Sequence, residues 1–241
     1  LKGETMPKFF VKTNQIEENK IKIIGEDVKH INQVLRAEIG EELTICNLDT
    51  TLNYITTISQ ITPEYVMCDI QDCVKSFVES NVQVTIFQGL PKADKMEYII
   101  QKNVELGVKK IIPVEMERSI VKFDQKTVAK KIERWQKISE VASKQSGRDI
   151  IPKIEIPTNI KKICENINEY DIVLVAYENE EDNTLKTELQ KIKRTDNLKI
   201  AIIIGPEGGI DKKEILQLKK VGAKTITLGQ RILRTETASI V

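Results

Sequence analysis

The stretch TLGQRILRTETASIV, residues 227–241, and the shorter stretch GPEGG, residues 205–209, decide the fold that we predict for this chain. Each follows a short apolar run typical of a β-strand and precedes a helical pattern. We therefore expect both to be loops at the carboxyl ends of neighbouring strands. In open α/β sheets, ligands bind at that edge.

Strands and helices alternate through the second part of the chain. The last of the predicted helices begins with a capping-box pair, Asp211 and Glu214. Such alternation predicts an α/β domain with a mostly parallel sheet covered on both faces. The expected strands are 82–88, 109–114, 171–177, 199–204 and 225–228, and the expected helices are 92–106, 124–144, 160–167, 184–192 and 211–221.

The first part of the chain has a different pattern. Short alternating runs broken by turn residues extend from residue 8 to about 73, with one helical segment at 27–37. This spacing is typical of a small β-barrel. We therefore expect two domains, residues 6–75 and 76–241. Residues 1–5, LKGET, precede Met6 and are expected to be an expression remnant.

Composition excludes several classes of protein. The 241 residues are 40% hydrophobic and 30% charged, as in ordinary globular proteins. The longest aliphatic run, residues 200–204, is far shorter than the roughly 20 residues of a membrane helix, so we expect a cytoplasmic protein without membrane contact. The four cysteines form no CxxC pair and His30 is the only histidine, which argues against a metal site, a disulfide framework or a Ser/His/Asp hydrolase.

Positive charge is concentrated in the middle of the chain. Residues 118–153 contain ten Lys or Arg against four Asp or Glu, whereas residues 6–75 contain seven against eleven. Lys130, Arg134, Lys137 and Lys144 recur at helical spacing, which fits either a solvated helix face or a phosphate-binding surface. The RNA-binding candidates drawn from this pattern and from one cation of the first domain are Arg36, Arg118, Lys122, Arg134, Lys144, Gln145 and Arg148.

The two loops suit a flat, charged cofactor. The glycines of GPEGG let the backbone approach a ligand closely, but no lysine follows them and no GxGxxG pattern is present, so neither a P-loop nor a dinucleotide fold is indicated. The second loop places Arg231 and Arg234 around two apolar residues. These arginines could serve a ligand or form ordinary ion pairs.

The strings IGPEGG (204–209) and LGQRILRTETA (228–238) resemble the signature loops of the ribosomal RNA small subunit methyltransferase E family. Members of that family methylate N3 of a uridine in small-subunit (16S) ribosomal RNA. The resemblance covers nearly the whole chain from Met6 onward. Further matching segments are KxxxxxxIIQKNVELGV (92–108), PVEMERSIVK (113–122) and RWQKISEVASKQSGR (134–148).

This resemblance implies a SPOUT-type α/β methyltransferase domain whose carboxyl-terminal chain forms a trefoil knot. It implies S-adenosylmethionine as cofactor, small-subunit ribosomal RNA or the assembled subunit as partner, and a homodimer. The first domain would be a PUA-like β-barrel that binds RNA. The residues that the resemblance assigns to the cofactor are Gly205, Glu207, Gly208, Gly209, Leu228, Gly229, Ile232 and Leu233.

Two residues of the second loop are candidates for the chemistry. Arg234 is expected to contact the target base or its phosphate and to stabilise the uracil anion. Glu236 is a weaker candidate, because capping of the final helix explains it equally well.

The sequence departs from the family pattern at two places. Ile210 and Asp211 stand where relatives more often have Phe and Ser or Thr. The sequence also stops at Val241, in the first turns of the closing helix, and we expect this to weaken the knot or the dimer. The alternatives are a non-catalytic RNA-binding or ribosome-assembly factor on the same fold, and a nucleotide-dependent oxidoreductase, which the missing fingerprint disfavours.

Overall fold

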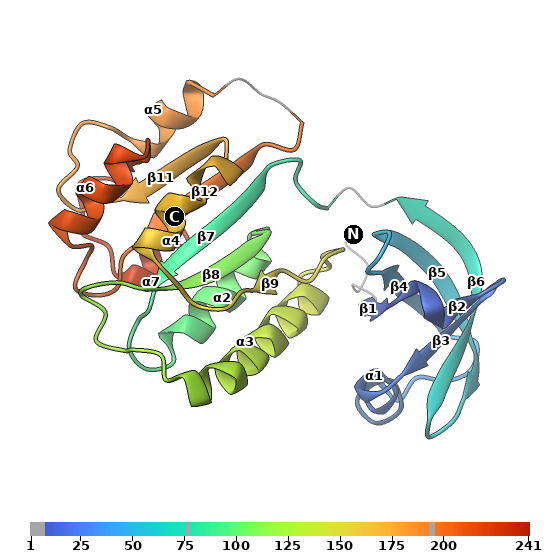
Figure 1. The fold of residues 1–241 in the computed structure, drawn as a ribbon. Coiled ribbons are helices and arrows are strands. Elements are labelled where there is room, and N and C mark those ends of the chain that lie inside the picture. Colours follow the sequence, from blue (N-terminus) through green and yellow to red (C-terminus); the bar gives the residue numbers. More distant parts are fainter. Residues whose placement is uncertain (1–7, 76–77, 193–195) are drawn as a thin grey trace. The chain divides into compact units, whose positions relative to one another are not determined.

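The computed structural model describes residues 8–75, 78–192 and 196–241. Residues 1–5, with their predicted expression remnant, lie outside these ranges. The chain divides into two compact units (Figure 1): unit 1 is Leu1–Glu79 with Ser143–Ile151, and unit 2 is Ser80–Ala142 with Pro152–Val241. The sequence places the division after residue 75 and does not predict that the segment Ser143–Ile151 belongs to unit 1.

Unit 1 is built on a six-stranded sheet in the order β1-β4-β5-β6-β3-β2. The alternation of residue types in β3 favours a strand with one buried face. Ile21 and Ile23 are buried, while the lysines between and before them are exposed. Beside the sheet lie α1 (Glu26–Lys29) and a π-type turn (His30–Leu35), in place of the single helix predicted at 27–37. The strands are β1 (Lys8–Val11), β2 (Ile16–Glu17), β3 (Lys20–Ile24), β4 (Glu42–Asn47), β5 (Leu52–Ile61) and β6 (Tyr65–Lys75).

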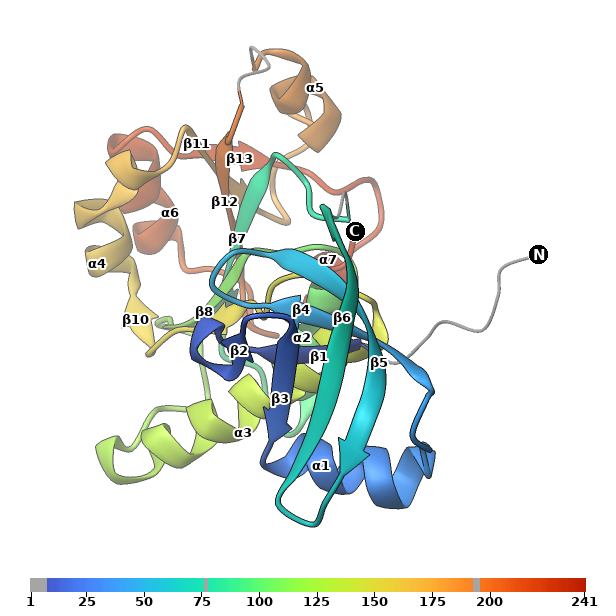
Figure 2. The ribbon, with the colours of Figure 1, turned by 90° about the vertical axis from the view of Figure 1, so that its right-hand side faces the viewer.

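The sheet of unit 1 is open. Figure 2 shows the long strands β5 and β6, which form the middle of the sheet, and their register shifts after Ile55 and again after Ile58. Among the described residues no ladder joins the edge strands β1 and β2, so the predicted small β-barrel is not closed. The edge strand β2 contains only two residues and so offers few backbone groups for pairing with a further strand.

Unit 2 contains a seven-stranded parallel sheet in the order β10-β8-β7-β12-β11-β13, with β9 paired to β8. The prediction of a parallel α/β sheet is confirmed, and the two short strands β9 and β10 were not predicted. The strands are β7 (Gln83–Gly89), β8 (Lys110–Glu115), β9 (Lys153–Ile154), β10 (Thr158–Asn159), β11 (Ile172–Ala176), β12 (Lys199–Ile204) and β13 (Lys224–Ile226).

Helices cover both faces of this sheet (Figure 1), which explains why its strands are apolar on both sides. On one face, Ile86 and Ile204 pack with α2 (Lys95–Glu105) and with Trp135 of α3 (Gln125–Gln145). On the other, Ile203 packs with helices α4 and α6. The remaining helices are α4 (Ile160–Glu165), a 3-10 turn (Ile167–Glu169), α5 (Leu185–Gln190), α6 (Lys212–Lys220) and α7 (Thr235–Ala238).

The start of α6 follows the sequence pattern closely. The Asp211 side chain accepts from the backbone N–H of Lys213 at 2.9 Å, and Glu214 accepts from the N–H of Asp211 at 3.2 Å. The predicted capping box is therefore confirmed. Because the box fixes where α6 begins, it also fixes the end of the preceding loop. Among the described residues, no helix combines the length and apolar character needed to span a membrane.

Candidate active site

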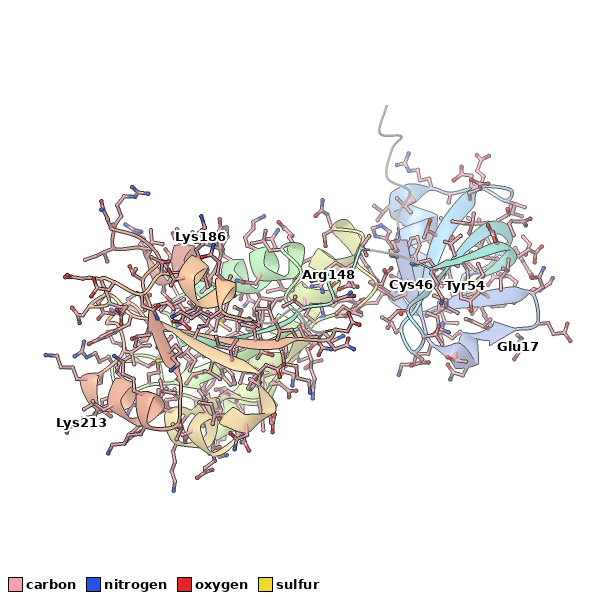
Figure 3. All side chains as sticks on the ribbon, turned by 90° about the horizontal axis from the view of Figure 1, so that it is seen from above. Glu17, Cys46, Tyr54, Arg148, Lys186 and Lys213 are labelled. Atoms are coloured by element: carbon pink, nitrogen blue, oxygen red, sulfur yellow. The ribbon has the colours of Figure 1, made fainter. Side chains whose placement is uncertain are left out.

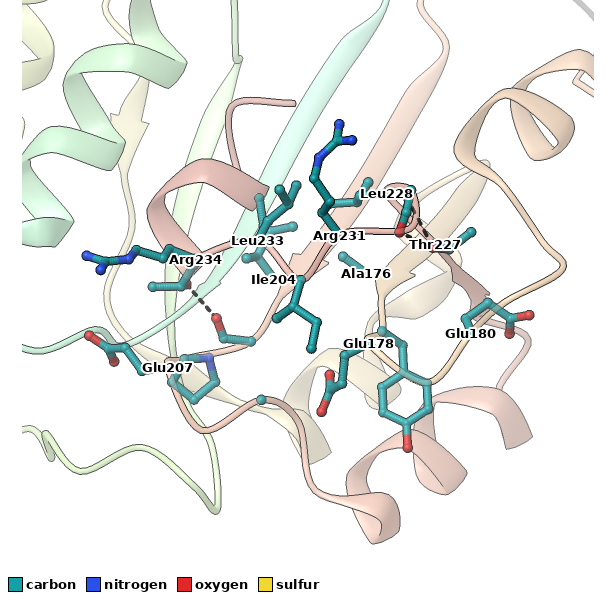
Figure 4. A pocket seen from close by; sticks show the side chains of 18 of the residues that line it. Ala176, Glu178, Glu180, Ile204, Glu207, Thr227, Leu228, Arg231, Leu233 and Arg234 are labelled. Carbon is teal, nitrogen blue, oxygen red and sulfur yellow. Dashed lines mark hydrogen bonds between the residues drawn. The ribbon is translucent and has the colours of Figure 1, made fainter.

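A pocket of about 1130 Å³ lies at the carboxyl ends of β12, β11 and β13, where three loops meet. Its volume is close to the upper end of the range typical of small-molecule sites, roughly 300–1,000 Å³. Figure 4 shows apolar side chains of Ile204, Leu228 and Leu233 around it, with charged side chains toward both ends. The pocket is lined by all eight residues assigned to the cofactor, Gly205, Glu207, Gly208, Gly209, Leu228, Gly229, Ile232 and Leu233.

The loop after β12 forms the first wall, and its position depends on a glycine outside the loop. Gly89 ends β7, and a Cβ atom there would lie 2.5 Å from the backbone nitrogen of Pro206 and 2.8 Å from the carbonyl carbon of Gly205. Since backbone atoms have little room to move, only glycine permits this close approach. Gly89 was not predicted as a functional residue, because a single glycine at the end of a strand carries no distinctive signal.

The closing segment forms the second wall and is attached to the first. The Thr235 hydroxyl, in the first turn of α7, donates to the carbonyl oxygen of Gly205 at 2.6 Å. The Gln88 side chain at the end of β7 donates to the same hydroxyl at 2.8 Å. Thr235 is buried, so this junction is shielded from water. The two loops that the sequence singled out therefore meet through one buried threonine.

A third loop, residues 177–184 after β11, was not predicted as part of the site. Tyr177, Glu178 and Glu180 line the pocket. The Glu178 carboxylate lies directly over Gly209, where a Cβ atom would come within 2.5 Å of its Oε1. Glu180 accepts a hydrogen bond from the Thr225 hydroxyl, which lowers the pKa of its carboxyl group although partial burial opposes this. This loop could have been predicted as part of the site. It follows the apolar strand IVLVA, and ligands bind at the carboxyl ends of the strands in such sheets.

A charged group lies where the first loop, α2 and α7 meet. Lys95, in the first turn of α2, places Nζ 3.0 Å from Oε1 of Glu207 and 3.4 Å from Oε2 of Glu236. The hydrogen bond that Lys95 donates to Glu207, aided by the nearby negative charges, raises the pKa of Lys95 although desolvation opposes this. Burial acts to raise the pKa of Glu207, but backbone hydrogen bonds, including one from Lys92 N–H, together with Lys95 keep it below its ordinary value. Lys95 was not among the residues predicted for the site.

The two residues predicted for the chemistry have different environments. Arg234 lines the pocket and is exposed, and Figure 4 shows its side chain on the same side of the pocket as that of Glu207. No ion pair or hydrogen bond of its guanidinium group occurs within the described part of the chain. Glu236 is not among the lining residues, and its carboxylate is directed to Lys95. Among the described residues, no group of three His, Cys, Asp or Glu side chains is arranged to hold a metal ion.

Three of the predicted RNA-binding residues belong to unit 2. The Arg118 guanidinium donates to the Gly208 carbonyl at 3.1 Å and lies 3.4 Å from the Asp211 carboxylate, so it braces the first wall of the pocket. Lys122 is exposed. Arg134 pairs with Glu97 at 2.8 Å, but 66% of its side chain is exposed. Such an exposed pair is weak enough for a phosphate to replace the carboxylate.

The other four belong to unit 1. Arg36 and Gln145 are exposed, whereas Lys144 pairs with Asp27 at 2.6 Å. Arg148 differs from the prediction, because only 6% of its side chain is exposed and its guanidinium contacts Glu79 at 2.6 Å. A buried cation with a carboxylate partner has an internal role. We therefore leave Arg148 out of the RNA-binding surface.

Comparisons with known proteins agree with this geometry. The pattern of the RNA methyltransferase domain family matches residues 78–241. Ribosomal RNA small subunit methyltransferase E of Bacillus subtilis is 34% identical over 242 residues, covering 98% of the chain and 93% of that protein. The protein of the same name from Buchnera aphidicola of Acyrthosiphon pisum is 32% identical, covering 100% of the chain and 92% of that protein.

One similar solved structure contains a ligand. The crystal structure of a ribosomal RNA small subunit methyltransferase E from Neisseria gonorrhoeae, bound to S-adenosyl methionine, matches with a TM-score of 0.84 at 30% identity. The match covers 98% of the chain and 94% of that protein. The likeness therefore extends over both units and not only over the pocket.

Proposed function

The chain belongs to the ribosomal RNA small subunit methyltransferase E family, and we propose that it transfers a methyl group from S-adenosylmethionine to small-subunit ribosomal RNA. The observation that carries the proposal is the pocket itself, in which the two family loops are joined by the bond between Thr235 and Gly205. Relatives that cover nearly the whole chain carry the same name, and one of them was crystallised with this cofactor.

The pocket residues fit the proposed cofactor. Gly205 and Gly209 line the pocket and carry no side chain, so their backbone groups can serve a ribose or an adenine edge, and Leu228 and Leu233 offer apolar surface to a flat base. Glu178 supplies negative charge near the first wall, which suits a ligand with a sulfonium and an ammonium group. The side chain of Glu207 is directed to Lys95, so in this proposal its loop contributes mainly backbone groups.

The bound cofactor would supply an electrophilic methyl group on a positively charged sulfur. We propose N3 of a uridine as the acceptor: a bond from N3 to the methyl carbon forms, the bond from carbon to sulfur breaks, and the N3 proton passes to water. Deprotonation leaves negative charge on the uracil, which Arg234 at the mouth of the pocket is placed to stabilise. Positioning of the two reactants supplies further acceleration. Glu236 acts indirectly in this scheme, through Lys95.

Both units supply groups for RNA contact in this proposal. In unit 2 these are Arg118, Lys122 and Arg134, and in unit 1 they are Arg36 and Gln145. Lys144 joins them if RNA phosphate displaces Asp27. Unit 1 would bind RNA as PUA-like domains do, although its sheet is open. We propose the cytoplasm as the location, because ribosomal RNA is found there.

The path of the closing segment supports a SPOUT-type trefoil knot as a further part of the proposal. β13 lies at one edge of the sheet, yet Thr235 reaches Gln88 at the end of β7, and Ser239 lies 3.3 Å from the Asn103 side chain of α2. The chain therefore returns across the ends of two strands, as a knotted segment must. A homodimer is proposed on family grounds, and sedimentation of the purified protein would test it.

Methyl transfer to unmodified small ribosomal subunits tests the function most directly. With isotope-labelled cofactor we expect label in a single uridine, at N3, after digestion and mapping. Naked small-subunit RNA in a parallel reaction shows whether assembly is required. Cofactor binding without any transfer to either substrate would favour the non-catalytic assembly factor, and label on another atom would refute the N3 assignment.

A further inference from the structure

Lys95 joins three segments of unit 2 that are distant in sequence, and we propose that it is a positioning residue for Arg234. It holds the carboxylates of Glu207 and Glu236, so that the guanidinium group of Arg234 stays available to the RNA substrate. The inference rests on the proposed function, because it gives Arg234 a substrate to contact. It adds a residue that no motif of the sequence identifies.

The first carboxylate is firmly held. Glu207 Oε1 accepts from Lys95 Nζ at 3.0 Å and from the backbone N–H of Lys92 at 3.0 Å. Lys92 lies just before α2 and Lys95 is its first residue, so Glu207 is anchored to one short stretch of chain. A carboxylate oxygen with two donors has little tendency to turn toward a third.

The second carboxylate depends on Lys95 alone within the described structure. Only 17% of the Glu236 side chain is exposed, and its buried Oε2 has no hydrogen-bond partner of good geometry. Within the described residues, the ion-pair contact with Lys95 Nζ at 3.4 Å is the interaction that holds this oxygen. A partly buried carboxylate that loses its cation must protonate or find another cation.

Arg234 is the cation that would replace Lys95. It precedes Glu236 by two residues, it lines the same pocket as Lys95 and Glu207, and Figure 4 draws its side chain on the same side of that pocket as Glu207. Among the described residues its guanidinium group makes no ion pair, although arginine pairs readily with carboxylates in a two-pronged geometry. The availability of Arg234 is therefore explained by a lysine that already holds both neighbouring acids.

The charge balance leads to the same conclusion. Lys95 and Arg234 together cancel Glu207 and Glu236, so the group of four is neutral. Without Lys95 it carries one net negative charge, which opposes both RNA phosphate and a uracil anion at short range. The raised pKa of Lys95, caused first by the hydrogen bond to Glu207, keeps its ammonium group charged at neutral pH.

The test compares Lys95→Met with Lys102→Met, a matched control on the same helix. Lys102 has nearly the same side-chain exposure, 34% against 32%, and pairs with Glu105 within α2. We expect Lys95→Met to lower kcat at least about 10-fold, and by no more than the roughly 100- to 1000-fold expected for loss of an anion-stabilising group itself. Cofactor Kd should stay within about threefold of wild type, and Lys102→Met should keep the wild-type kcat.

A triple variant separates positioning from direct contact. Adding Glu207→Gln and Glu236→Gln to Lys95→Met removes both negative charges that would capture Arg234, so kcat should recover most of the loss. If the triple variant stays as slow as Lys95→Met, or if Lys95→Met equals wild type, the positioning role is overturned. A wild-type protein that transfers no methyl group would instead overturn the proposed function, so the two failures are distinguishable.

A spectroscopic readout tests the same point without turnover. In protein with isotope-labelled arginine, free of RNA and cofactor, the Nε–H of Arg234 should exchange rapidly with water in the wild type and slowly in Lys95→Met. Assignment comes from loss of the signal in Arg234→Lys. Equal exchange rates in the two proteins would contradict the capture of Arg234 by the freed carboxylates.

Discussion

The group around Asp149 in unit 1 and the group around Lys95 in unit 2 each combine two cations with two carboxylates. In unit 1, Asp149 pairs with Lys8 and Glu79 pairs with Arg148, so every charge has a partner. In unit 2, Lys95 holds both carboxylates and Arg234 makes no ion pair within the described residues. The first arrangement stabilises unit 1, whereas the second leaves one cation available to a ligand.

The largest expected effect concerns the buried group. Asp149→Ala leaves the Lys8 ammonium, only 9% exposed, without its carboxylate, which should cost about 3–5 kcal/mol of unfolding free energy. The matched control is Lys20→Ala, because the Lys20–Asp69 pair in the same unit is 60% and 39% exposed and should contribute only about 0–1 kcal/mol. Urea unfolding of both variants measures the difference. Equal losses would mean that burial does not distinguish these pairs.

Gly89→Ala tests how the pocket of unit 2 is held in place. Its Cβ atom would collide with backbone atoms of Pro206 and Gly205, so we expect a loss of about 1–3 kcal/mol in stability and weaker cofactor binding. In Gly222→Ala nothing lies within 4 Å of the new Cβ, but φ is +100°, so only local strain is added. Calorimetry should show weaker cofactor binding for Gly89→Ala alone. If Gly89→Ala bound the cofactor as tightly as the wild type, the close contact at Gly89 would not be needed to shape the pocket.

A smaller effect is expected at the exposed cations. Lys122→Ala and Arg134→Ala should each weaken RNA binding modestly and reduce the slope of log K against log salt by about 1. The control is Lys213→Ala, which should leave the slope unchanged. Lys213 extends from α6, on the opposite face of the sheet from α3 (Figure 3). Fluorescence titration over a range of salt concentrations measures these slopes. If both test variants kept the wild-type slope, neither Lys122 nor Arg134 would contact RNA phosphate, and the positive face of α3 would be an ordinary solvated surface.

The smallest effect concerns the cysteines of unit 1. Burial raises the pKa of Cys46 to about 12 and that of Cys68 to about 11, so at pH 8 about one part in 10⁴ of Cys46 is thiolate. We expect a thiol reagent to label the exposed Cys73 quickly, and the other two only after unfolding. Rapid labelling of Cys46 in the folded protein would contradict its buried position.

The same shifts predict a pH dependence of stability. A thiol whose folded pKa exceeds its unfolded value stabilises the fold fully below the unfolded value of 9.0, and this contribution is lost as pH rises toward the folded pKa. Melting temperature should therefore fall above about pH 9. The fall should be smaller in Cys46→Ala, and an identical fall in that variant would argue against this cause.

Local patterns predicted a large part of the structure. The capping box at Asp211 and the loops GPEGG and TLGQR were predictable because a few adjacent residues determine them. The burial of Arg148 was not, because its partner Glu79 lies 69 residues away and only folding joins them. Lys95 was missed for the same reason, since Glu207 is 112 residues distant. Sequence spacing identifies charges, but whether a charge is already paired depends on tertiary contacts.

Turnover of Arg234→Ala at saturating RNA and cofactor tests the central claim most directly. If Arg234 stabilises the uracil anion, kcat should fall by about 100- to 1000-fold while cofactor Kd stays nearly unchanged, because the lost contact belongs to the reaction and not to cofactor binding. Full turnover in this variant would contradict the account, and the available cation of unit 2 would then have no role in the chemistry.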